Sequence, residues 1–166
     1  MLKDNFQSLA DNRIEFMKRI VFDDEVAKCL LNKSPNFKST TVTQLEKASL
    51  MYSQVFPFSK TTNTLVDTKA YITMKFQYKK TNKLNIFKIA SVTFYVFCHE
   101  SIITTPYAVL RSDFLLSQID RLMNDTESTN DGWIGKLSLS KMDDIIMDSE
   151  GKYIGLAVTY TDMEFQ

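Results

Sequence analysis

The sequence predicts one α+β domain in which helices pack against an antiparallel β-sheet. Three observations support this prediction. In the first third of the chain, apolar residues recur every three or four positions, which is typical of amphipathic helices. In two later regions they alternate with polar residues, which is typical of strands. A helical period returns between those two regions, so the expected order is helices, hairpin, helix, hairpin.

Length and composition fit a single domain. The chain has 166 residues, of which 44% are hydrophobic and 12% aromatic, so it is long enough to bury one core. We expect one domain over residues 1–166, with a helical N-terminal part at 1–53 and a ββαββ core at 66–166. Twenty basic residues balance 20 acidic ones, which argues against a free-standing DNA-binding protein.

Targeting and metal-binding signals are not recognisable. No apolar run approaches the roughly 18 residues of a membrane span, and Met1–Asn5 continues into an amphipathic segment rather than a secretory signal. We therefore expect synthesis in the cytoplasm and no membrane partner. Cys29 and Cys98 make neither a disulfide framework nor a metal-ligand spacing, so we expect no cofactor and no metal.

Three helices are expected in the N-terminal part. The first runs from Asn5 to Ile20 on the spacing of its apolar side chains. Asp23-Asp24-Glu25 predicts the start of a second, because carboxylates there accept hydrogen bonds from unpaired amides and suit the positive end of the helix dipole. Thr43 and Glu46 have the spacing of a capping box, which predicts a third helix from Gln44 to about Tyr52.

Two hairpins and one further helix make up the rest. Strict alternation from Ala70 to Tyr78 predicts a strand, and it should pair with Ile86 to Cys98, which is apolar on both faces and therefore central in the sheet. A helix capped by Ser112 follows. The second hairpin is expected from alternation around Leu137 and from Ile154 to Tyr160. Its turn lies near Asp148 to Gly151.

The residues that could take part in catalysis or cofactor binding do not form a recognisable pattern. Cys98 lies beside the only histidine, His99, but neighbouring strand residues point to opposite faces, so the two cannot act as nucleophile and base. The glycine-containing stretch from Gly132 to Gly135 lacks both the P-loop lysine and the third glycine of a dinucleotide fingerprint. We expect no catalytic and no cofactor-binding residues.

An acidic run could suggest a cation site. Its spacing does not match an EF-hand loop, which favours a solvated hairpin turn. The run comprises Asp143, Asp144, Asp148 and Glu150.

A basic cluster marks the tip of the first hairpin. It comprises Lys79, Lys80 and Lys83. A single tip of this kind is normally a solvated turn, but several copies around a ring would line a channel that attracts DNA. We expect these lysines to contact either DNA in a channel or a neighbouring ring.

The central strand yields a second interaction hypothesis. Because both of its faces are apolar, one face is covered either by this chain's own helices or by a neighbouring subunit. The subunit interface would include Phe87, Ile89, Tyr95 and Phe97.

Several packing and turn motifs are spread over most of the chain. They are Asp23-Asp24-Glu25-Val26-Ala27-Lys28, the Val55-Phe56-Pro57-Phe58 turn before Tyr71-Ile72-Thr73, Leu110-Arg111-Ser112-Asp113 before the helix that ends Ile119-Asp120-Arg121-Leu122-Met123-Asn124, Trp133-Ile134-Gly135-Lys136-Leu137, and the strand from Gly155 to Asp162. Together these motifs resemble a family of small bacteriophage tail-terminator and neck proteins. The resemblance implies a sheet flanked by helices.

The same resemblance implies a non-enzymatic structural protein of the virion neck or tail. It would form a homo-oligomeric ring, commonly a hexamer of six copies, that joins the head-side connector and its adaptor to the tail tube, with non-specific DNA contact in a central channel. Alternatives are another neck component, such as a connector adaptor or a tail completion protein, and a small cytosolic enzyme. A nucleic-acid-binding module that uses the hairpin lysines is a further alternative.

Overall fold

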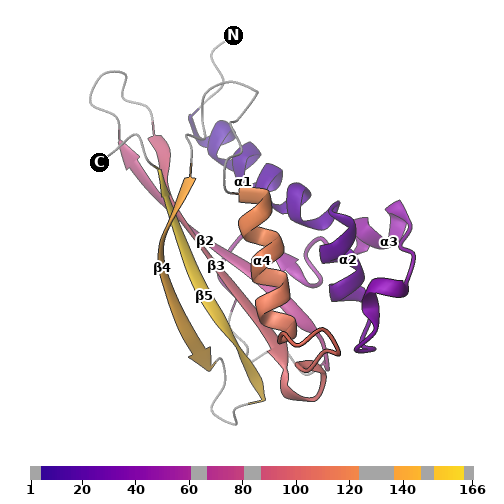
Figure 1. Cartoon of the computed structure of the whole chain (residues 1–166). Coiled ribbons are helices and arrows are strands. Elements are labelled where there is room, and N and C mark those ends of the chain that lie inside the picture. The colour runs from indigo at the N-terminus through magenta and orange to yellow at the C-terminus, as the bar shows by residue number, and fades with distance from the viewer. Residues whose placement is uncertain (1–4, 61–66, 81–86, 124–136, 147–151, 163–166) are drawn as a thin grey trace.

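The computed structural model describes residues 5–60, 67–80, 87–123, 137–146 and 152–162. It has the α+β fold predicted from the sequence, with N-terminal helices followed by a sheet and a further helix (Figure 1). In chain order the elements are α1 (Asn5–Val21), α2 (Asp24–Leu31), the 3-10 helix η1 (Phe37–Ser39), α3 (Gln44–Ser49), β1 (Val55–Phe56), β2 (Ala70–Lys80), β3 (Phe87–His99), the 3-10 helix η3 (Glu100–Ile102), α4 (Arg111–Met123), β4 (Leu137–Ile146) and β5 (Tyr153–Asp162).

Five strands form one mixed, mostly antiparallel sheet in the order β1-β2-β3-β5-β4. β3 is central, as its apolar character on both faces predicts, and it pairs antiparallel with β2 and with β5. β4 pairs antiparallel with β5, which confirms the second hairpin. The predicted turn of that hairpin, Asp148 to Gly151, lies outside the described residues.

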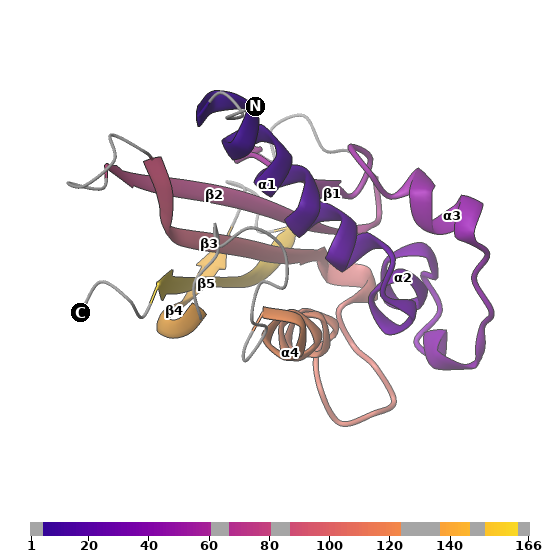
Figure 2. The same ribbon diagram turned by 90° about the horizontal axis from the view of Figure 1, so that it is seen from above.

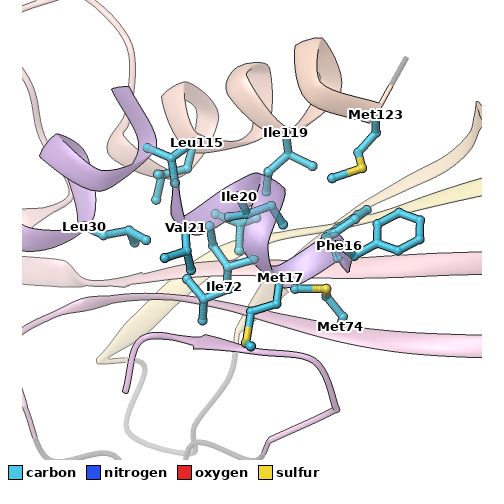
Figure 3. Packing of buried hydrophobic residues seen from close by; sticks show 14 of the residues in the cluster. Phe16, Met17, Ile20, Val21, Leu30, Ile72, Met74, Leu115, Ile119 and Met123 are labelled. Carbon is cyan, nitrogen blue, oxygen red and sulfur yellow. The ribbon is translucent and has the colours of Figure 1, made fainter. Parts of the chain in front are cut away.

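The helices lie on one side of the sheet (Figure 1). α1 packs on β3 and β1, and α4 packs on β3 and β5 (Figure 2). Between them lies the main core, in which Phe16 and Ile20 of α1 meet Leu115 and Ile119 of α4 over Met74 of β2 (Figure 3). Because strand side chains alternate, the even-numbered residues of β2 supply this face.

The opposite face of the sheet carries a smaller aromatic cluster. Phe56, Tyr71, Phe97 and Tyr153 are buried there, and Tyr95 packs against them. Described residues between β1 and β2 help to cover them: the Tyr153 hydroxyl donates to the main-chain oxygen of Asp67 at 2.6 Å. The Lys60 ammonium lies 4.1 Å from the centre of the Phe56 ring.

The predicted starts of α2 and α3 are confirmed. Asp23 caps α2, its carboxylate accepting from the Val26 amide at 3.0 Å. At α3 the capping box is complete: the Glu46 amide donates to the Thr43 hydroxyl at 3.3 Å, and the Thr43 amide donates to the Glu46 carboxylate at 2.8 Å. α3 ends at Ser49, earlier than the sequence predicts, because the chain turns at Tyr52, where φ is 59°.

Two local predictions need correction. Val55 and Phe56, expected in a turn, form β1 and pair parallel with β2, so the sheet is mixed rather than purely antiparallel. A strand of two residues has no readable period, and only its pairing identifies it. Ser112 does not cap α4, because the helix already includes Arg111 and the Phe114 amide donates to Leu110 oxygen at 2.9 Å.

Candidate functional site

The helix-facing side of β4 carries exposed apolar side chains. The register places Leu139 beside Tyr160 and Met142 beside Val158, so both share the face on which α4 packs. Yet 51% of Leu139 and 59% of Met142 remain exposed. These side chains therefore lie on an apolar surface at the edge of the sheet that this chain leaves partly uncovered.

A groove of about 520 Å³ lies between α4 and the β4–β5 hairpin. It is lined by Asp113, Leu116, Ser117, Asp120, Leu139, Met142, Asp144, Leu156, Val158 and Tyr160. We call this set the edge groove. Its dimensions fall in the range of binding clefts in proteins.

The edge groove combines an apolar floor with acidic groups. Leu116 of α4 and Leu156 and Val158 of β5 supply its apolar lining, whereas Asp113 and Asp144 are exposed. Among the described residues that line it, none is basic. The groove therefore favours a partner that is apolar and positively charged.

One hydrogen bond holds the groove together from inside. The Tyr160 hydroxyl of β5 donates to Asp120 Oδ1 of α4 at 2.7 Å. Burial, followed by this contact with Asp120, raises the pKa of the Tyr160 phenol above its ordinary value. Tyr160 therefore stays neutral at physiological pH and keeps α4 joined to the sheet.

β4 is irregular where it borders the groove. Leu139 pairs with Tyr160, but Lys141 pairs with the preceding residue, Thr159, so Ser140 is the extra residue of a β-bulge. The Ser140 hydroxyl donates to Thr159 oxygen at 3.0 Å. The bulge brings the odd-numbered Leu139 and the even-numbered Met142 to the same face, and so builds the apolar wall of the groove.

The predicted basic cluster lies at the far end of the first hairpin. Lys79 and Lys80 are exposed and pair in register with Lys88 and Phe87. Lys83 lies outside the described residues. The β2–β3 ladder continues to Lys80, whereas the β3–β5 ladder ends at Ser91, so this hairpin end extends beyond its neighbour strand.

The four residues predicted for a subunit interface do not share one face. Gln77 pairs with Ser91 but Tyr78 pairs with Ile89, so a bulge at Ala90 reverses the alternation of β3. Ile89 consequently lies in the main core, 3% exposed, whereas Phe97 is fully buried in the aromatic cluster on the other face.

The remaining two residues predicted for the interface are Tyr95 and Phe87. Tyr95 is half-buried, and the side chain of Phe87 lies outside what the structure describes. The single chain thus already covers Ile89 and Phe97, as the intramolecular alternative has it. A role for the set in subunit contacts stays a prediction.

Cys98 and His99 point to opposite faces, as predicted. Cys98 is buried in the main core, whereas His99 bonds the Ser101 hydroxyl at 2.9 Å and its ring meets Tyr153 edge-on. Burial raises the pKa of the Cys98 thiol and raises that of Cys29 to about 12. Both thiols therefore stay protonated at neutral pH, in which form they are weak nucleophiles.

The acidic run is divided by the fold. Asp144 lines the edge groove and Asp143 makes an exposed ion pair with Lys141 at 2.8 Å. Asp148 and Glu150, like the stretch from Gly132 to Gly135, lie outside the described residues. Within the described ranges, no three His, Cys, Asp or Glu side chains lie close enough to hold a metal ion.

Sequence reasoning did not find the edge groove. Its residues come from α4, β4 and β5, and no single segment contributes a contiguous motif. A weak signal was present: Met142 lies among polar residues in a stretch with strand character. The groove became visible only when the register placed it beside Val158.

The fold and the groove define an α+β domain with an apolar, acidic groove at a sheet edge. The chain matches the model of the YomW family over residues 23–161, and it belongs to that family. The match runs from the N-cap of α2 to the penultimate residue of β5. No curated protein and no solved structure matches the chain. None of the described helices is long and apolar enough to cross a membrane.

Proposed function

We propose that this protein is a structural virion protein of a tailed bacteriophage, which assembles into a ring at the head–tail junction like the tail terminators that its sequence resembles. The observation that carries the proposal is the edge groove. Leu139 and Met142 expose more than half of their surface beside a cleft, on a strand at the edge of the sheet. Such surfaces mark sites of protein–protein contact.

The energetics favour assembly through this surface. Complete burial of one large aliphatic side chain stabilises a contact by about 1.5–3 kcal/mol. Leu139, Met142 and the groove floor together supply several such contributions, which must outweigh the free-energy cost of association. In a closed ring each subunit makes the contact twice, once with each neighbour, so a modest interface is sufficient.

The basic hairpin end fits the same proposal. Lys79 and Lys80 are exposed at the end of β2, whereas the acidic groove is built from other elements. The chain therefore carries separate basic and acidic surfaces although its net charge is zero. In a ring these lysines face a DNA-containing channel, a neighbouring ring or a neighbouring subunit. Each of these contacts would weaken as salt concentration rises.

Two measurements test the proposal. The mass of the purified protein, by native mass spectrometry alone and with virion extract, should show a ring of defined copy number. In a phage that carries Met142→Asp, electron microscopy should show tails unjoined to heads or of uncontrolled length. Leu45→Asp is the matched control, because Leu45 is 82% exposed on α3, away from the groove.

Two outcomes would overturn the proposal. One is a protein that stays monomeric both alone and with virion extract. The other is a Met142→Asp phage with normal tailed particles. Rings found at another position in the neck would assign the protein to the alternative, a connector adaptor or a tail completion protein.

A further inference from the structure

We propose that the Lys79–Lys80 end of the β2–β3 hairpin of one copy docks into the edge groove of the next copy. This inference rests on the proposed function, because it names the contact by which the ring closes. The hairpin end and the groove are different surfaces of one chain, so the contact is head-to-tail. Repetition of a head-to-tail contact generates a ring when the rotation closes and a filament when it does not.

The groove specifies a basic and apolar occupant. Its floor is formed by Leu116, Leu156 and Val158, and Asp113 and Asp144 are exposed beside it. No positive charge comes from the described lining residues to balance these carboxylates. A purely apolar partner would leave them next to a low-dielectric contact, which is unfavourable unless they meet positive charge.

The hairpin end has the complementary chemistry. Lys79 and Lys80 are exposed, and the sequence that follows them, Thr81-Asn82-Lys83-Leu84-Asn85-Ile86, adds a third lysine and two aliphatic residues. The paired strands carry this end past Ser91, the last residue of β3 that pairs with β5. The described part of the hairpin therefore presents its lysines beyond the main body of the sheet.

Charge complementarity favours this occupant over DNA. Lysines can bind either DNA or an acidic protein surface. The acidic groove, however, favours a cationic protein segment and repels the phosphates of DNA. The other exposed lysines among the described residues are Lys18 on α1, Lys33 after α2, Lys38 in η1, Lys75 on the face of β2 away from the helices, Lys141 on β4 and Lys152 before β5, and none of them is followed directly by a second lysine. The hairpin end is the place where consecutive lysines precede apolar residues.

The contact is tested directly by mixing two variants, each of which lacks one of the two surfaces. If the contact exists, they form a dimer that cannot grow further, which we call the capped dimer. The first variant, Lys79→Ser with Lys80→Ser, has an intact groove but a hairpin end without these two charges, so it cannot pair with a groove whose charge is reversed. The second, Asp113→Lys with Asp144→Lys, has an intact hairpin end but a reversed groove. Asp120 is left unchanged because it accepts the Tyr160 hydrogen bond. Circular dichroism and thermal melting check that each variant is folded.

We expect each variant alone to be monomeric in analytical ultracentrifugation at concentrations where the wild type assembles. An equimolar mixture should form a one-to-one dimer and nothing larger, because only one intact hairpin end and one intact groove remain. The dissociation constant of the dimer should rise at least tenfold when NaCl is raised from 50 to 500 mM, as expected for exposed charge pairs. Lys18→Ser with Lys33→Ser, which changes the net charge equally, should assemble like the wild type.

Several results would overturn the contact. They are a mixture that stays monomeric, rings that persist in the hairpin variant, and a hairpin variant that loses binding to a double-stranded oligonucleotide but still forms rings. The last result would assign the lysines to DNA. Rings that form without this contact would leave the proposed function standing, whereas a capped dimer from a protein absent from the virion would refute the proposed function alone.

Discussion

Arg111 Nη1 donates a hydrogen bond to the main-chain oxygen of Cys29 at 2.6 Å and so joins α4 to α2 across 82 residues of sequence. The guanidinium is fully buried and lies 5.0 Å from the centre of the Phe37 ring. It also donates to the main-chain oxygens of Asn32 at 2.7 Å and Ser34 at 3.0 Å. These carbonyls at and after the end of α2 lack helical partners, and Arg111 satisfies them.

Arg111→Met should therefore destabilise the fold strongly. It removes the donors while leaving the buried main-chain oxygen of Cys29 and the part-buried oxygens of Asn32 and Ser34 unpaired, and a buried unpaired oxygen costs about 1–3 kcal/mol. We expect the free energy of unfolding, measured by urea denaturation, to fall by about 3 kcal/mol or more. Arg121→Met is the control, because the Arg121–Asp23 ion pair is largely exposed on the arginine side and should contribute about 1 kcal/mol or less. Similar losses in both variants would contradict this role.

Gly155→Ala should destabilise the fold strongly, although it adds only a methyl group. A Cβ at this position would lie 1.9 Å from the main-chain oxygen of Val96 and 2.6 Å from Phe97 Cα. Backbone of the central strand would have to move to accommodate it, which costs about 3 kcal/mol or more. Thermal melting should show a large decrease in Tm or no folded protein. Ile154→Ala, at a 40% exposed neighbour, should have a small effect; the reverse order would refute the argument.

Native-state thiol labelling should be very slow. Cys29 and Cys98 are fully buried, and burial raises the pKa of both, to about 12 for Cys29. At pH 8 an aromatic disulfide reagent should modify neither residue faster than the protein opens, and both should react at once in urea. Cys98→Ser should leave particle assembly intact. Rapid labelling of the folded protein, or loss of assembly in folded Cys98→Ser, would contradict these expectations.

Alkaline pH should destabilise the protein partly through Tyr160. Its pKa is raised in the folded state, so the unfolded chain loses the phenolic proton first. The contribution of Tyr160 to the free energy of unfolding is therefore fully present below about pH 10 and decreases as pH rises above that value. Urea denaturation at pH 8 to 11 should show a decrease in stability that is smaller in Tyr160→Phe. At pH 8 the variant should lose about 1 kcal/mol for the missing hydrogen bond to Asp120. An unchanged alkaline slope would refute the assignment.

The sequence by itself determined the features that depend on neighbouring residues. Asp23 reaches an amide three positions away, and Thr43 and Glu46 cap each other over the same separation. The strand alternation and the hairpin order are likewise encoded over short distances. These elements were predictable because their hydrogen bonds and periods involve residues close in sequence.

Only the tertiary structure decided the rest. β1 exists because Val55 and Phe56 meet Ile72 and Thr73, and α4 begins at Arg111, whose side chain meets carbonyl groups about 80 residues earlier. The bulge at Ala90 moves Ile89 to the helix-facing side, against simple alternation. The edge groove depends on the packing of α4 against β5 together with the bulge at Ser140. In each case the partners are distant in sequence or the strand register shifts, so neither a period nor a spacing encodes the outcome.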